Sequence, residues 1–335
     1  MSIRKTVYLL TVLLISTSLL IQFTVAPSQA QDATFDFTTS YKAPSNFTSR
    51  CTSVYPIVGK EPATPGTYPV FIHLVGSFEH HDNSEAIVFI EEMAKRGYVA
   101  ASVDYAQWFA SASTFDDRAR CIYNGTDTNS AVAQLCARAK ADCSRGIITS
   151  GFSFGAWFAA RAANHEARVQ AVYALGLNDK ANLGEYLDLL VPGSRTLPND
   201  RLRIISGASS AYDGDGYSER ETVRMQLNTI TGLNCAVTAE SCLRPNGSGW
   251  YMVQDTDVQD GKADHCYFRV GTTATACSER PFDIGWIPLA NNEWSLSTNL
   301  DWLTQFITSP SPSPSYRSFI PFVSNATTSG PPELQ

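Results

Sequence analysis

The chain has 335 residues, of which 44% are hydrophobic, 11% aromatic and 17% charged. This composition is typical of a globular protein with a large core and excludes a disordered or fibrous chain. The formal net charge is −7 and Lys and Arg form no cluster, which argues against a nucleic-acid partner.

The first thirty residues have the pattern of a secretory signal peptide. Arg4 and Lys5 precede an apolar run, and the small-residue site Ser28-Gln29-Ala30 follows it. The run is about fifteen residues long, shorter than the ~20 that cross a bilayer as a helix. The sequence therefore predicts cleavage after Ala30, export to the extracellular space and no stable membrane insertion. An uncleaved membrane anchor is the alternative.

From residue 68 onward, short apolar runs alternate with amphipathic segments. The predicted strands are 68–75, 98–103, 146–150, 169–175, 202–206 and 250–253. The predicted helices are 84–96, 128–141, 154–165, 217–230 and 296–307. This alternation predicts an α/β fold with a mostly parallel central sheet and helices on both faces. Functional residues are expected directly after the strands, because the carboxyl ends of parallel strands meet at one edge.

The chain changes character near its C-terminus. Residues 309–315 alternate Ser and Pro, a pattern that does not pack into a core and favours extended conformations. The sequence thus predicts three segments: a signal peptide over 1–30, one folded domain over 31–308, and a Pro/Ser-rich linker with a C-terminal tail over 309–335.

The chain contains eight cysteines, which in an exported protein are expected to form disulfides. They are Cys51, Cys121, Cys136, Cys143, Cys235, Cys242, Cys266 and Cys277. The pairs Cys235/Cys242 and Cys266/Cys277 are favoured, because each would close a small polar loop. No CxxC pair is present, so no metal site is expected.

The sharpest motif is Gly151-Phe152-Ser153-Phe154-Gly155, which lies between an apolar strand and an Ala-rich helix. A strand that turns abruptly into a helix holds its central serine in a strained conformation, and glycines two positions before and after it leave room for that turn. The following helix directs its N-terminal N–H groups and its dipole at the serine. Ser153 is therefore the predicted nucleophile, and a structural turn is the alternative.

A serine hydroxyl needs a base to take its proton, and histidine is the usual one. The strand–serine–helix turn is called the nucleophile elbow. His265 follows the last predicted strand and is the preferred candidate, because chains with this elbow place the serine first, the acid next and the histidine last. His165 lies at the far end of the helix after the elbow, and His73, His80 and His81 precede the serine. A packed histidine beside a disulfide is the alternative for His265.

The acid that orients the histidine is expected after the strand that ends near Ser206. Asp213 and Asp215 both lie in the Gly-rich loop that follows this strand. We choose Asp213 because it is closer to the strand end, and Asp215 is the second candidate. One of the two is expected to be a solvated turn residue.

Together these residues make the chain resemble the α/β-hydrolase superfamily, in particular its secreted esterase-like and lipase-like members of the dienelactone-hydrolase and polyester-hydrolase type. The resemblance covers roughly 68–268 and implies that 31–308 is an α/β-hydrolase catalytic domain. It also implies an oxyanion hole made by the N–H groups of Phe154 and Ser77. The stretch His73-Leu74-Val75-Gly76 departs from the family's H-G motif, and Asp104 matches a residue that is usually structural.

The activity implied is acyl transfer from a small-molecule or polymeric carboxylic ester, with no cofactor. Only about 25 residues separate the strands at 169–175 and 202–206, which leaves little room for a large lid and favours an open site. Aromatic residues that could line the acyl side are Phe78, Trp108, Phe109, Phe152 and Phe154. Two other functions remain open: a peptidase of the same fold, and a secreted binding protein without catalytic activity.

Overall fold

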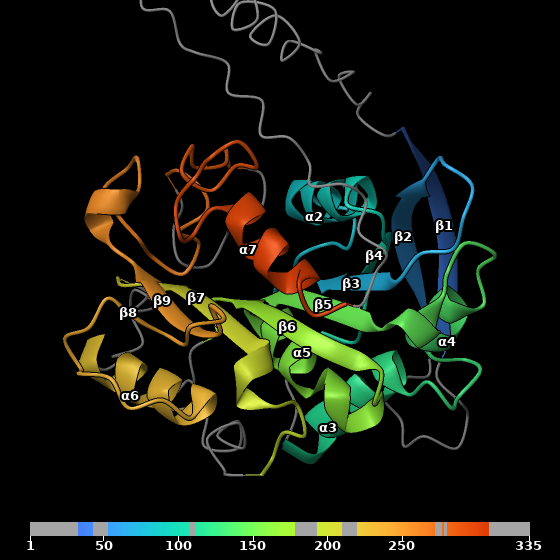
Figure 1. The fold of residues 1–335 in the computed structure, drawn as a ribbon, viewed down its shortest axis with the longest axis horizontal. Helices are drawn as coiled ribbons and strands as arrows, with labels where there is room; N and C mark the ends of the chain where they lie inside the picture. The colour runs from blue at the N-terminus through green and yellow to red at the C-terminus, as the bar shows by residue number, and fades with distance from the viewer. Residues whose placement is uncertain are drawn as a thin grey trace, which may run out of the picture.

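The computed structural model describes residues 33–42, 53–107, 112–177, 193–209, 220–271, 277 and 280–307, with backbone alone at 112–115 and 220–222. The predicted signal peptide and the predicted linker and tail lie outside these residues. The described strands form one nine-stranded sheet in the order β1-β2-β4-β3-β5-β6-β7-β9-β8 (Figure 1).

Six strands at the centre of the sheet run parallel to one another. They are β4 (Val99–Val103), β3 (Val70–Leu74), β5 (Ile147–Phe152), β6 (Val169–Leu175), β7 (Leu202–Gly207) and β9 (Gly249–Val253). All six were predicted from the apolar runs. Their side chains are mostly buried, as expected for strands that are covered on both faces.

The edges of the sheet carry antiparallel strands that the apolar runs did not predict. β1 (Thr34–Lys42) and β2 (Val54–Pro62) form a hairpin-like pair beside β4, and β8 (Ser241–Leu243) pairs with β9. A mostly parallel sheet with this strand order, an antiparallel amino-terminal edge and a strand–serine–helix turn after β5 defines the α/β-hydrolase fold. The predicted fold class is confirmed.

Helices cover both faces of the sheet (Figure 1). α2 (Ser84–Lys95) and α7 (Leu296–Thr304) lie on one face, where most of their buried apolar residues join one core cluster. α3 (Ala112–Tyr123), α5 (Phe154–His165) and α6 (Arg220–Thr231) lie on the other face and belong to a second cluster. The remaining helices in the described part of the chain are short: α4 (Ala131–Cys136), η2 (Cys143–Arg145), η5 (Asn199–Arg201) and η6 (Asp255–Asp257).

The helix predicted over 128–141 is much shorter in the structure. Ser130 caps its start by accepting a hydrogen bond from the N–H of Ala133, and the helix ends at Cys136. Arg138 then pairs with Glu61 on β2 at 2.7 Å. The local sequence pattern would have continued the helix beyond Cys136, but tertiary contacts determine the conformation of the residues that follow.

The two disulfides predicted from loop length are confirmed. Cys235 pairs with Cys242 and Cys266 with Cys277, and a third pair joins Cys136 to Cys143. Cys121 is also disulfide-bonded.

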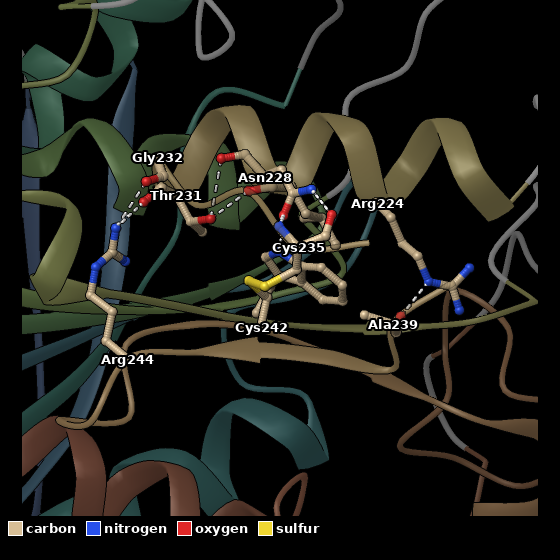
Figure 2. The surroundings of a disulfide bond; sticks show 10 residues. Arg224, Asn228, Thr231, Gly232, Cys235, Ala239, Cys242 and Arg244 are labelled. Atoms are coloured by element: carbon tan, nitrogen blue, oxygen red, sulfur yellow. Dashed lines mark hydrogen bonds between the residues drawn. A yellow bond between two sulfur atoms is a disulfide. The ribbon is translucent and has the colours of Figure 1, made fainter. Parts of the chain in front are cut away.

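The Cys235–Cys242 disulfide joins the segment after α6 to β8 (Figure 2). The Asn228 side chain on α6 supports it by donating to the Cys235 carbonyl at 2.8 Å, and Asn228 also accepts from the indole of Trp250 on β9 at 3.0 Å. Arg244 donates to the Thr231 carbonyl at the end of α6. These bonds hold α6 against β9 and β8, the two strands at this edge of the sheet.

Among the described helices, none is long and apolar enough to span a bilayer. The described residues also hold no group of three or more His, Cys, Asp or Glu side chains arranged to bind a metal ion.

Candidate active site

Ser153 occupies the sharp turn between β5 and α5. Its backbone has φ 50° and ψ −114°, a region that residues with a Cβ rarely adopt. A Cβ on Gly151 would run into the backbone of Gly155, and a Cβ on Gly155 would run into the carbonyls of Leu74 and Val75. The two glycines therefore permit the close approach that this turn requires, and Ser153 remains half-buried at the surface of the turn.

His265 is brought to the same turn through the end of β6. The Ser153 N–H donates to the Leu175 carbonyl at 2.8 Å. The next residue, Gly176, has φ 60°, and a Cβ on it would lie 2.9 Å from Cε1 of His265. The imidazole also packs on Phe152, the residue before the nucleophile, with ring centroids 4.8 Å apart. The predicted nucleophile and the predicted base thus lie against the same short stretch of backbone.

Both candidates for the acid, Asp213 and Asp215, lie outside the described residues. The segment that leads to them leaves β7 along the loop that carries His265. Its last described residue, Ser209, donates its N–H to the Ala263 carbonyl at 2.8 Å. The loop after β7 therefore starts beside the histidine loop, which is where a residue that orients the imidazole is needed.

The loop after β3 holds one of the two predicted oxyanion donors. The Gly76 N–H donates to Oε2 of Glu79 at 2.9 Å, and the Phe78 N–H donates to Oε1 of Gln107 at 2.5 Å. The N–H of Ser77, between them, meets no acceptor among the described residues. Among the contacts between described residues, the Ser77 N–H is thus the one of these three neighbouring amides without an acceptor, as its predicted role of oxyanion donor requires.

The second predicted donor, Phe154, is the first residue of α5. Its N–H lies at the positive end of the helix dipole, with the other N–H groups that point out of the first turn. Gly155, next to it, packs directly against the carbonyls of Leu74 and Val75, at the start of the loop that holds Ser77. The structure thus brings together the two segments that were predicted to form the oxyanion hole.

A second set of serine, histidine and carboxylate lies beneath this site. His73 lies within β3, where its Nδ1 bonds Oγ of Ser150 at 2.7 Å and its Nε2 bonds Glu85 at 3.2 Å. The three residues are fully buried, and the imidazole stacks on Phe89. Burial lowers the pKa of His73 to about 3 and raises that of Glu85 to about 7. Because none of the three side chains is exposed, we assign this set a structural role.

Glu79 is a buried carboxyl that the sequence did not single out. Burial, reinforced by the nearby Glu85, raises the pKa of Glu79 to about 8, and the charge of Arg269 acts in the opposite direction. The hydrogen bond from the Gly76 N–H also lowers the pKa of Glu79, and Oε2 accepts this bond whether or not the carboxyl is protonated. No motif marks Glu79 or Gln107, and only the folded loop shows that they contact the same segment.

The aromatic residues predicted to line the acyl side have different surroundings. Phe152 is buried in the core, Phe154 is half-buried, and Phe78 is 74% exposed beside Ser77. Trp108 and Phe109 lie outside the described residues. Phe78 is thus the described aromatic residue of this set that is most accessible to a substrate.

The other histidine near the elbow helix has a separate partner. His165 ends α5, and its Nε2 lies 2.9 Å from the carboxylate of Asp116 on α3. This contact ties the two helices together on the face away from α2 and α7. His165 is thus a structural residue of the helix layer.

No protein-family model and no curated protein matches the chain. Solved structures similar to it include a dienelactone hydrolase-like promiscuous phosphotriesterase from metagenomic libraries, which is 14% identical over 82% of this chain and 98% of that chain, with a TM-score of 0.43. Esterase 2 of Thermogutta terrifontis is 13% identical over 82% of this chain and 96% of that chain, with a TM-score of 0.45. An α/β serine hydrolase without lid from Xanthomonas campestris is 13% identical over 72% and 89%, with a TM-score of 0.43. The likeness is one of fold.

Proposed function

We propose that the protein is a secreted serine hydrolase that cleaves carboxylic esters through an acyl-enzyme intermediate. The observation that carries the proposal is the left-handed backbone of Ser153 at the strand–helix turn, with His265 packed against the adjoining end of β6. Strain of this kind, about 1–3 kcal/mol, persists where the surrounding structure holds it, as at active sites. Three disulfides among the described residues are typical of an exported protein and support secretion.

In the proposed reaction, Oγ of Ser153 attacks the ester carbonyl while His265 accepts its proton. The N–H groups of Ser77 and Phe154 bind the oxygen that becomes negatively charged. The tetrahedral intermediate collapses, and His265 returns the proton to the departing alcohol. Water, activated by the same histidine, then attacks the acyl-enzyme and releases the carboxylic acid. Asp213 is the proposed acid that orients the imidazole.

The substrate class follows from the surface around the serine. Ser153 is half-buried rather than enclosed, and the exposed ring of Phe78 lies one residue from a proposed oxyanion donor. An apolar acyl or alcohol group would cover this ring and bury its surface from water. The proposal is therefore a small-molecule or polymeric ester with an apolar part, rather than a charged substrate.

The proposal is tested on the secreted full-length protein with p-nitrophenyl acetate, butyrate and palmitate, beside a panel of chromogenic peptides and a fluorophosphonate that labels active serines. We expect ester hydrolysis, covalent labelling at Ser153 shown by mass spectrometry, and no peptide cleavage. Peptide cleavage without ester hydrolysis would favour the peptidase. A folded protein that neither hydrolyses esters nor takes the label would be a binding protein that has kept the fold.

The choice between the two acids is tested with Asp213→Asn and Asp215→Asn. Asparagine keeps the shape of the side chain but loses the charge that stabilises the imidazolium, so the variant at the true acid is expected to lose roughly 10³- to 10⁴-fold in kcat. We expect this loss in Asp213→Asn and a change of less than about threefold in Asp215→Asn, because a solvated turn residue contributes little. The reverse result would transfer the role to Asp215.

A further inference from the structure

The Ser77 amide lies between two backbone groups that are bonded to side chains. Gln107, which follows β4, accepts the N–H of Phe78 and donates its own Nε2 to the carbonyl of Glu79 at 2.7 Å. Oε2 of Glu79 accepts the N–H of Gly76. We propose that Gln107 and Glu79 are positioning residues that clamp the oxyanion loop, residues 76–79, so that the Ser77 N–H faces the substrate. This inference rests on the proposed function.

The oxyanion loop needs such a clamp because its own backbone is strained. Phe78 has φ 64°, in the left-handed region, which costs about 1–2 kcal/mol for a residue with a Cβ. The only backbone hydrogen bond within the loop is a long one, 3.3 Å from the Glu79 N–H to the Gly76 carbonyl. The two bonds of Gln107 reach Phe78 and Glu79 together, so they hold the strained residue from both sides.

The anchoring point of the clamp is rigid. Gln107 lies four residues after the end of β4, which is the neighbour of β3 in the sheet. Tyr105, two residues earlier, donates its hydroxyl to the Val75 carbonyl at 2.6 Å. Through Tyr105 and Gln107, the segment after β4 therefore contacts the segment after β3. The elbow contacts the segment after β3 separately, through Gly155. The Ser77 amide is held relative to Ser153 by two independent sets of contacts.

Burial strengthens the hydrogen bonds of the clamp. Glu79 is 7% exposed and Gln107 is half-buried, so their hydrogen bonds are formed away from water and are costly to lose. Because Oε2 of Glu79 acts as the acceptor for the Gly76 N–H, glutamine can replace Glu79 with its carbonyl oxygen in the same place. Methionine has a similar length and keeps the packing of either residue, but it cannot make these bonds.

The test compares Gln107→Met, Glu79→Met and Glu79→Gln in the secreted full-length protein. The two methionine variants are expected to lose about 10- to 100-fold in kcat on p-nitrophenyl butyrate, because a shift of ~1 Å in an oxyanion donor has this effect. KM should change by less than about threefold, since substrate binding in the ground state does not use the donor. Glu79→Gln should stay within about threefold of the wild type in kcat.

Hydrogen–deuterium exchange supplies a reading that does not depend on activity. The amides of Gly76, Phe78 and Glu79, which are hydrogen-bonded, should exchange at least about tenfold faster in Gln107→Met than in the wild type. The matched control is Gln134→Met on α4, which removes a glutamine that donates to a backbone carbonyl at 2.7 Å but lies on a helix packed against β1 and α3. It should change neither kcat nor the exchange of the loop.

The outcomes separate this inference from the proposed function. An active wild type together with a folded Gln107→Met of unchanged kcat, or a loss confined to KM, would overturn the clamp alone. A wild type without ester hydrolysis would overturn both the function and the role of the Ser77 amide. If Gln107→Met does not fold, Gln107→Glu takes its place. It keeps the acceptor for Phe78 but loses the donor to the Glu79 carbonyl, so kcat must still fall.

Discussion

Replacing Ser153 by alanine is expected to lower kcat/KM for every ester substrate by ~10⁴-fold or more, because the variant lacks the oxygen that forms the acyl-enzyme. The residual rate would come from the oxyanion donors and from substrate binding. The fold should remain intact, because the hydroxyl of Ser153 caps no helix and alanine needs less space at this turn. Steady-state kinetics on p-nitrophenyl butyrate and fluorophosphonate labelling measure the loss.

The matched control for this prediction is Ser150→Ala. Ser150 lies three residues earlier on β5, and its buried hydroxyl bonds Nδ1 of His73. Its loss leaves a buried nitrogen without a partner, which costs about 1–3 kcal/mol of stability. Ser150→Ala should therefore unfold at a lower urea concentration and still hydrolyse esters. If Ser150→Ala were inactive and Ser153→Ala active, the buried set would be the catalytic one and our assignment would be wrong.

The parts of the fold that were predictable are those in which local pattern and burial agree. β6 (169–175) and α5 (154–165) match the predicted residues. A continuous apolar run favours a strand that is buried on both faces, and an Ala-rich segment favours a helix that packs on the sheet. The disulfides Cys235–Cys242 and Cys266–Cys277 were predictable because a short loop keeps its ends together. The motif around Ser153 predicted the strand–helix turn that the structure shows, and the proposed site is built on this turn.

The missed parts depend on contacts that a pattern does not show. β1 alternates weakly between apolar and polar residues and leaves Phe35 57% exposed, so its strand conformation comes from pairing with β2 rather than from burial. α4 stops where Arg138 reaches Glu61 on β2. In the candidate site, His265 was proposed from chain order, whereas Gln107 bonds a loop 29 residues away in sequence and belongs to no motif.

A second large effect is expected at the elbow glycine: Gly155→Ala should destabilise the protein by about 2–4 kcal/mol. Inside a helix, alanine in place of glycine ordinarily stabilises by about 1 kcal/mol, so helix propensity predicts the opposite sign. Here a Cβ would collide with the carbonyls of Leu74 and Val75, which are backbone atoms fixed at the end of β3 and cannot rotate away. α5 must therefore move outward, and the Phe154 amide moves with it.

Urea unfolding followed by tryptophan fluorescence, with the disulfides intact, measures the loss of stability in Gly155→Ala. Ester hydrolysis measures the effect of displacing the Phe154 amide, and we expect kcat to fall by about 100-fold. Gly261→Ala is the matched control: this glycine has φ 68°, but a Cβ on it meets no atom within 4 Å. It should lose only the ~1–2 kcal/mol of a left-handed residue and keep full activity. If Gly155→Ala were as stable as the wild type, α5 would not be held against β3 at the distance described. The elbow and the oxyanion loop would then not form one rigid site.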